Sequence, residues 1–178
     1  MDRSERRTPG RASRSERLGR GSTPLSLIVR AFQPGDEAAF RDINLEWIER
    51  FFVVEAKDRE VLGNPHKYIL DPGGAIFLAV DGDEPVGAVA LMLMGEGSVE
   101  LAKMGVRPQA QGRGAGRMLV AAAVEQARAM GMKRVYIETN SALKPAIKLY
   151  HDAGFRPLAN PIPSPYARAD VQLELILG

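Results

Sequence analysis

The stretch QGRGAGR, from Gln111 to Arg117, constrains the fold of this chain more than any other part of its sequence. It stands between an apolar run typical of a strand, at 98–106, and a run rich in Ala, Met and Leu that predicts a helix closed by Gly131. Each glycine at a helix start costs roughly 0.5–1 kcal/mol relative to alanine, because its backbone is freer. We therefore expect a ligand to approach the backbone of this loop so closely that side chains would obstruct it.

A phosphate group fits such a loop, since N–H groups at a helix N-terminus point outward and carry the positive end of the helix dipole. Arg113 and Arg117 would add positive charge. The loop is not a P-loop, because no Gly-Lys-Ser/Thr ending is present. Counted from Gly112 or from Gly114, it also lacks the third glycine of the dinucleotide-binding fingerprint. Taken alone, the loop could equally be a tight turn with solvated arginines.

The elements around the loop predict one α/β domain without internal repeats. Pro34 and Asp36 mark the start of the first helix, and a second helical stretch is interrupted at Gly63-Asn64-Pro65. Apolar runs bounded by turn residues predict the strands. We expect strands at 25–32, 75–80, 86–93, 98–106, 133–139, 155–158 and 170–177, and helices at 34–52, 57–70, 116–132 and 143–154.

Residues 1–24 differ in composition from the rest of the 178-residue chain, with seven arginines, three acidic residues and almost no apolar side chains. Such a segment cannot bury enough surface to offset its chain entropy. We expect a disordered extension at 1–24 and a folded domain at 25–178. An arm that binds nucleic acid is the alternative, and we do not favour it.

The composition narrows the classes of function. The chain has no cysteine and only two histidines, His66 and His151, so neither a thiol nucleophile nor a metal site is expected. No apolar run has the length of roughly 18–20 residues that a membrane span needs, and no apolar signal-peptide core is present at the N-terminus. We expect a cytoplasmic protein without a membrane partner.

Two motifs flank the loop in a fixed order. Val-Arg-Pro at 106–108 precedes it, and AIKLYHDAGF at 146–155 follows. Gln111, Gly114 and Gly116 match a Gln/Arg-x-x-Gly-x-Gly/Ala signature. With these motifs, the region 100–158 resembles the GNAT superfamily of N-acetyltransferases, and weaker agreement in the order of elements extends over 25–178. The resemblance implies an α/β fold with a mixed, mostly antiparallel central sheet, a splayed strand pair and flanking helices.

The resemblance also implies acetyl-CoA as a cosubstrate. The loop backbone would hold the pyrophosphate, and the pantetheine arm would lie like an extra strand beside the backbone of Met104 and Val106. Asn140 is either a further cofactor contact or a turn residue before the next helix. The implied cofactor-binding residues are Met104, Val106, Gln111, Gly112, Arg113, Gly114, Ala115, Gly116, Arg117 and Asn140.

Acetyl transfer to an amine needs a base, because the attacking amine must be neutral. Glu100 is the candidate, since it lies eleven residues before the glutamine of the loop, the spacing of a base in the histone-acetylating members. On a regular strand, Ala102, Met104 and Val106 would share its face. The alternatives are an ordinary strand-edge glutamate, an ion-pair partner for Lys103, and a water chain that replaces a direct base.

Tyr150 is the candidate acid for the departing thiolate. It occupies the tyrosine position of the GNAT-like motif at 146–155, before Gly154-Phe155. A phenol at this position can donate a proton. The alternative is a half-buried helix tyrosine without a chemical role. The backbone N–H of Met104 is the implied donor to the oxyanion.

The acceptor is expected to be a primary amine of a small molecule or a peptide. Tyr166 and Arg168 lie near the C-terminus, where Arg168 could hold a carboxylate with two hydrogen bonds or form a surface ion pair. Glu55 could attract an ammonium group or cap a helix. Trp47 and Phe51, four residues apart on a helix, are expected in the core.

Two functions of different class remain from the sequence. One is an N-acetyltransferase that uses acetyl-CoA. The other is a non-catalytic sensor of the same fold that binds acyl-CoA. The presence of both Glu100 and Tyr150 favours the enzyme. The amine acceptor is not identified, and a homodimer is left open.

Overall fold

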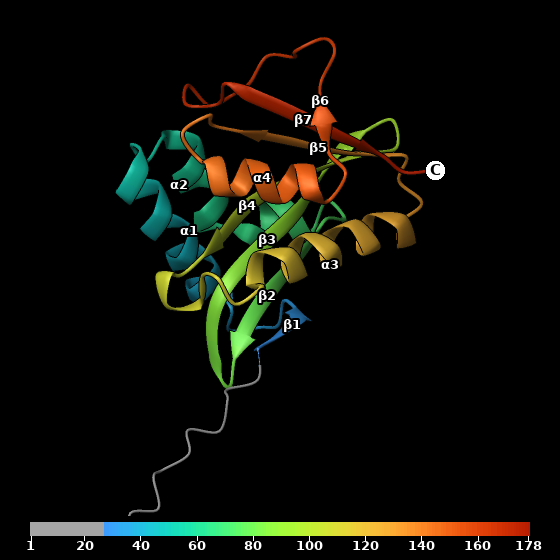
Figure 1. The fold of residues 1–178 in the computed structure, drawn as a ribbon. Helices are drawn as coiled ribbons and strands as arrows, with labels where there is room; N and C mark the ends of the chain where they lie inside the picture. Colours follow the sequence, from blue (N-terminus) through green and yellow to red (C-terminus); the bar gives the residue numbers. More distant parts are fainter. Residues whose placement is uncertain (1–26) are drawn as a thin grey trace, which may run out of the picture.

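Seven strands form one mixed sheet in a computed structural model that describes residues 27–178 (Figure 1). The predicted extension at 1–24 lies outside the described residues. The strands are β1 (Leu27–Ala31), β2 (Ala75–Asp81), β3 (Glu84–Gly95), β4 (Ser98–Val106), β5 (Arg134–Thr139), β6 (Arg156–Pro157) and β7 (Val171–Ile176). Their order is β1-β2-β3-β4-β5-β7-β6, and every neighbouring pair is antiparallel except β4 and β5. The predicted mixed, mostly antiparallel sheet is confirmed.

Four α-helices flank the sheet, as the sequence predicts. They are α1 (Glu37–Phe51), α2 (Ala56–Gly63), α3 (Ala115–Ala129) and α4 (Lys144–Asp152). The second helical stretch is broken where expected, because α2 ends at Gly63 and a π-helical turn follows at His66–Leu70. Figure 1 shows α3 and α4 on the near face of the sheet and α1 and α2 behind it.

Each face of the sheet has its own hydrophobic core, because successive side chains of a strand point to opposite faces. On β2, Leu78 and Val80 pack in the cluster that contains Phe40 and Ile43 of α1. Ala79, between them, packs in the cluster that contains α3. The glycine loop at 111–117 thus leads into α3, whose buried residues pack against one face of the sheet.

The pairing of β4 with β5 stops early. These parallel strands pair only over three residues each, Ser98–Glu100 with 134–136. β4 continues to Val106 and β5 to Thr139. The strands therefore separate beyond Glu100, which confirms the predicted splayed pair.

A β-bulge interrupts β4 at the point of separation. Lys103 has a φ of +49°, and the register with β3 shifts between Ala88 and Ala90. Two residues of β4 thus stand opposite one residue of β3, which reorients the side chains that follow. The bulge lies within the part of β4 that faces the gap.

The bulge overturns the expectation that Glu100, Met104 and Val106 share one face. Val99 and Leu101 belong to the cluster on the α3 side, so Glu100, between them, faces the other side. Met104 and Val106 nevertheless pack against the α3-side cluster. The alternation is reversed because an extra residue shifts a period of two by one position.

Candidate active site

The glycines of the loop meet different structural needs. Gly112 and Gly114 have φ values of +76° and +87°, a conformation in which a side chain is strained. Gly114 is also the N-cap of α3. Gly116 has helical backbone, but a Cβ there would lie 3.0 Å from Leu149 Cδ2 and 3.4 Å from Met104 Cε. The loop thus combines a helix N-terminus, whose N–H groups could hold a phosphate, with close packing against α4 and β4.

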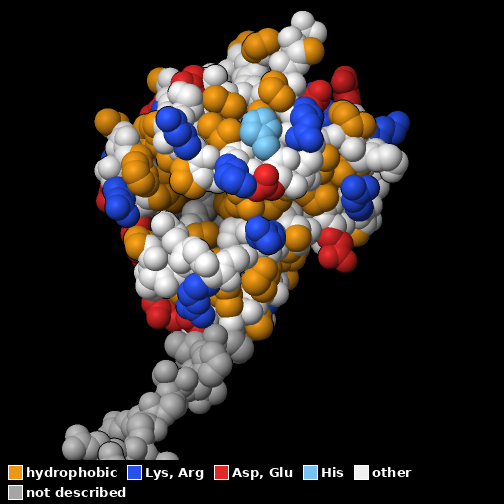
Figure 2. All heavy atoms as spheres, viewed as in Figure 1, with side chains coloured by type: hydrophobic (Ala, Val, Ile, Leu, Met, Phe, Trp, Pro, Cys, Tyr) orange, Lys and Arg blue, Asp and Glu red, His pale blue; other side chains and the backbone are white. Residues whose placement is uncertain are grey.

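Other residues of the loop attach it to the sheet. The Gln111 side chain donates to the carbonyl oxygen of Val106 at 2.9 Å, and Arg113 donates to the carboxylate of Asp81. Ala115 is buried and Arg117 is exposed. On the face that carries α3 and α4, Figure 2 shows Lys and Arg side chains around a hollow. This face can attract a polyanionic ligand.

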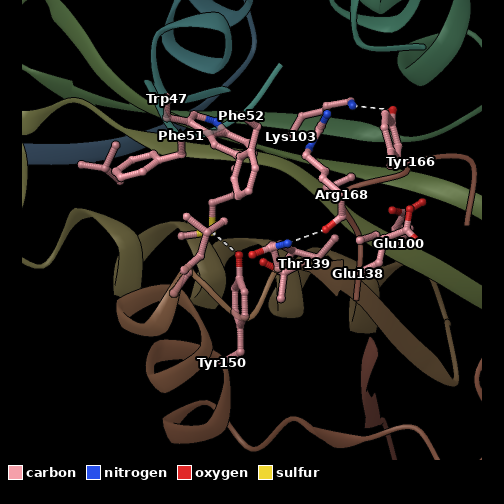
Figure 3. A pocket seen from close by; sticks show the side chains of 18 of the residues that line it. Trp47, Phe51, Phe52, Glu100, Lys103, Glu138, Thr139, Tyr150, Tyr166 and Arg168 are labelled. Atoms are coloured by element: carbon pink, nitrogen blue, oxygen red, sulfur yellow. Dashed lines mark hydrogen bonds between the residues drawn. The ribbon is translucent and has the colours of Figure 1, made fainter. Parts of the chain in front are cut away.

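A pocket opens where β4 and β5 separate (Figure 3). Its wall combines residues of α1, of both strands, of the segment before α4 and of the segment before β7. The lining residues on which the following description depends are Trp47, Phe51, Phe52, Glu100, Lys103, Met104, Val106, Gln111, Glu138, Asn140, Tyr150, Tyr166 and Arg168.

Glu100 lies in this pocket and has an unusual proton affinity. Burial and then the nearby charge of Glu138 raise its pKa to about 7, against a smaller opposing effect of Lys103. A carboxyl group with this pKa can exchange a proton near neutral pH. Glu138 was not predicted from the sequence. It follows Tyr136 by two positions on an apolar strand, so the alternation of side chains would have placed both residues on the same face.

Tyr150 of α4 lies in the same pocket and is buried, with 6% of its surface exposed. Its hydroxyl lies 3.7 Å from the sulfur of Met104. Burial raises the pKa of Tyr150 to about 12, so the phenol is protonated at neutral pH. The pocket therefore contains a proton acceptor on β4 and a proton donor on α4.

Asn140 is a turn residue, which is one of the two roles that the sequence left open for it. Its side-chain oxygen accepts from the N–H of Ala142 at 2.8 Å. Its side-chain nitrogen donates to the carbonyl oxygen of Arg168 at 2.6 Å. Asn140 thus ties the end of β5 to the segment before β7 while lining the pocket.

A buried ion network joins three segments that are distant in the sequence. Asp58 of α2, fully buried, accepts from both terminal nitrogens of Arg168 at 2.7 Å. Asp58 also accepts from Lys103 Nζ at 3.3 Å. The Lys103 ammonium further donates to the hydroxyl of Tyr166 at 2.6 Å. We call Asp58, Lys103, Tyr166 and Arg168 the buried clamp.

The buried clamp uses residues that the sequence assigned to the acceptor. Burial opposes ionisation of Asp58, but hydrogen bonds from Arg168 and from the Glu55 backbone, with the charge of Lys103, lower its pKa. Glu55 is the N-cap of α2 and accepts from Arg168 at 3.0 Å. Arg168 is thus paired with two carboxylates of the chain itself, in a partly buried ion pair.

The aromatic residues of α1 differ from the sequence expectation. Phe51 was expected in the core, but 54% of its surface is exposed. Trp47 is partly exposed and packs edge-on against Phe52. All three line the pocket (Figure 3). Helical spacing alone does not distinguish a core stripe from a pocket wall, because both need apolar side chains on one face.

Two classes of site are absent from the described part of the chain. Among residues 27–178, no cluster of three or more His, Asp or Glu side chains has the arrangement of a metal site. None of the helices in this range has both the length and the apolar character needed to cross a membrane.

Comparison with known proteins relates this chain to a family. The model of the acetyltransferase (GNAT) family matches residues 31–155. The uncharacterised N-acetyltransferase YjgM of Escherichia coli (strain K12) is 41% identical over 87 residues, which cover 47% of this chain and 52% of the relative. The chain thus spans about half the length of that relative.

Further similarities extend over more of the chain. A mycothiol acetyltransferase of Streptomyces scabiei is 33% identical over 142 residues, 74% of this chain and 44% of the relative. The crystal structure of a GNAT-family acetyltransferase from Staphylococcus aureus Mu50 superposes with a TM-score of 0.78, at 17% identity, over 86% of this chain and 100% of that one. The last similarity supports the fold.

Proposed function

The chain belongs to the acetyltransferase (GNAT) family, and we propose that it transfers the acetyl group of acetyl-CoA to a primary amine of a small molecule or peptide. One observation carries this proposal. The separation of β4 from β5 opens a pocket that contains both Glu100 and Tyr150, beside a glycine loop at the start of α3.

The loop and the edge of β4 would bind the cosubstrate. The N-terminus of the 15-residue helix α3 supplies a positive dipole end for the pyrophosphate. Beyond Glu100, the edge of β4 that turns away from β3 is not paired with β5. Main-chain groups along Met104 and Val106 can therefore bond an extended amide chain such as pantetheine.

Glu100 would act as the base. The acceptor enters as an ammonium ion, and its proton moves to the Glu100 carboxylate. The free amine attacks the thioester carbonyl carbon, and a C–N bond forms as the carbonyl oxygen becomes an oxyanion. The N–H of Met104, at the bulge, would stabilise that oxyanion.

Tyr150 would complete the transfer. The oxyanion collapses, the C–S bond breaks, and the departing thiolate takes the phenolic proton of Tyr150. The attacking nitrogen still carries two protons at this point and gives one of them, directly or through water, to the tyrosinate, which restores Tyr150 and leaves a neutral amide. Glu100 releases to solvent the proton that it received. The products are the N-acetylated amine and CoA.

Release of CoA, measured with acetyl-CoA and a panel of amines, tests this function. A sensor that only binds acyl-CoA would bind acetyl-CoA tightly and release no CoA with any amine. Turnover with at least one amine supports the enzyme, and its absence across the panel favours the sensor.

A pair of matched variants tests the cofactor site. Gly114→Asp should abolish acetyl-CoA binding, because it puts a negative charge into the phosphate cradle. Gly95→Asp is the control, since Gly95 has nearly the same φ, +89°, has the same open surroundings and is the last residue of β3, outside the loop. Equal calorimetric affinities of the two variants would contradict the assignment of the loop.

A further inference from the structure

The wall of the pocket is divided into an acidic part and an aromatic part. Figure 3 shows Glu100 and Glu138 on one side, where β4 and β5 are still close, and Trp47, Phe51 and Phe52 on the other. Lys103, Arg168 and Tyr166 of the buried clamp lie in the upper part of the view, with Arg168 between the two groups. A pocket divided in this way would favour some amine acceptors over others.

The two cations in the wall are neutralised by the chain itself. Arg168 bonds Asp58 at 2.7 Å and Glu55 at 3.0 Å. Lys103, which is 8% exposed, bonds Asp58 at 3.3 Å. A carboxylate on the acceptor would have to compete with partners that are already in place.

The two acids in the wall lack such compensation by a bonded cation. Glu138 accepts a hydrogen bond from the neutral hydroxyl of Tyr136 at 3.1 Å. Glu100 is close enough to Glu138 for the charge of Glu138 to raise its pKa. The wall therefore attracts an ammonium group and repels a carboxylate on the same molecule.

The aromatic part offers apolar surface at the mouth of the pocket. Phe51, which lines the pocket, is 54% exposed. The one polar atom of Trp47, its indole nitrogen, donates to Asn44 Oδ1 within α1 at 3.2 Å. Its ring therefore presents apolar surface to the pocket, and a bound apolar group would remove the surface of Phe51 from water.

We infer that the acceptor is a cationic amine with an aromatic or aliphatic body and without a carboxylate, held between the acid pair Glu100–Glu138 and the aromatic wall Trp47–Phe51–Phe52. This inference rests on the proposed function, because it assigns that pocket to the acceptor. An arylalkylamine has this chemistry, whereas a free amino acid does not.

Calorimetry with CoA present tests the inference without turnover. Phenethylamine, phenylalanine and phenylalaninamide share the amine and the ring and differ at the carboxylate. Phenethylamine should bind at least about tenfold more tightly than phenylalanine, which corresponds to about 1.4 kcal/mol. Phenylalaninamide, whose carboxylate is replaced by a neutral amide, should recover most of the difference. Propylamine should bind more weakly than phenethylamine, because it lacks the ring.

Variants assign the effect to each part of the wall. Glu138→Gln should weaken phenethylamine binding and narrow its preference over phenylalanine. Phe51→Ala should weaken phenethylamine binding and leave propylamine binding nearly unchanged. Glu125→Gln is the control for charge, because Glu125 is exposed on α3 and lies outside this pocket. It should behave as the wild type.

The outcomes separate the two proposals. Phenylalanine binding as tightly as phenethylamine, or propylamine binding as tightly as phenethylamine, would overturn the inference on the acceptor. Selective binding of phenethylamine without release of CoA from acetyl-CoA would overturn acetyl transfer and leave the inference on the ligand class intact.

Discussion

Replacement of Glu100 by glutamine tests whether this carboxylate is the base. The pKa of Glu100 is raised to about 7 by burial and by the charge of Glu138. Only the ionised form can take the proton of the acceptor ammonium. In the wild type, the rate of acetyl transfer should therefore rise with pH through the pKa of this one group.

The size of the rise follows from the pKa. For a group with a pKa of about 7, the ionised fraction grows from about 9% at pH 6 to about 91% at pH 8, so the rate should increase about tenfold. Glu100→Gln should remove this rise and lower the rate at pH 8 by about 10²–10⁴-fold, the usual contribution of a positioned base.

Single-turnover rates at saturating acetyl-CoA and acceptor are the appropriate assay, because they isolate the chemical step from product release. Glu138→Gln provides a second test. Removing the neighbouring charge should move the midpoint of the rise to lower pH, since that charge contributes to the raised pKa. A rise that persists unchanged in Glu100→Gln would show that another group is the base.

The same substitution has a separate effect on stability. Because the folded pKa exceeds the ordinary value of 4.5, the folded state binds the proton more tightly. The contribution of Glu100 to the free energy of unfolding is therefore fully present below pH 4.5 and decreases as the pH rises to 7. The decrease amounts to about 3 kcal/mol. Denaturant titrations should show Glu100→Gln gaining stability relative to the wild type across this range.

Three further substitutions test other parts of the site. Tyr150→Phe keeps the buried ring and removes the proton donor, so single-turnover rates should fall about 10²–10⁴-fold while the KM for acetyl-CoA changes little; a chemical step within about threefold of the wild type would mean that Tyr150 is only a packing residue. Asp58→Asn leaves Lys103 and Arg168 buried without their shared carboxylate, so the free energy of unfolding in denaturant should fall by about 3–5 kcal/mol, and no measurable fall would show that the buried clamp is not stabilising. Gly105→Ala would place a Cβ 2.5 Å from Trp47 Cδ1, so we expect a loss of about 1–3 kcal/mol and a raised acceptor KM, and an unchanged KM would show that the position of the Trp47 ring does not affect acceptor binding.

Local features of the site were predictable from the sequence. The glycine loop, the helix after it and the break at Gly63-Asn64-Pro65 depend on residues that are near one another in the chain. Gly114, for example, has a conformation that its own backbone chemistry allows and a side chain would strain. The resemblance further placed Glu100 and Tyr150 in one pocket, and both line it.

Only the tertiary structure decided how the site is assembled. The bulge at Lys103 arises from the pairing of β4 with β3 and reverses the face of Met104, which no periodicity in the strand indicates. Phe51 is exposed because no other segment within residues 27–178 packs over it. Its helical spacing does not show this, because a core residue would have the same spacing.

The charges of the site show the same division between local and distant information. The sequence contains all four charged residues, but it does not show how they pair. Asp58 neutralises Arg168, which is 110 residues away in the chain. Glu138 lies near Glu100 without a bonded cation in the described part of the chain. Local conformation follows from neighbours in the chain, whereas proton affinity and ion pairing depend on distances between segments. The sequence by itself thus determined the family, the loop and the candidate groups, and the packing of three distant segments decided which of those groups carry free charge into the pocket.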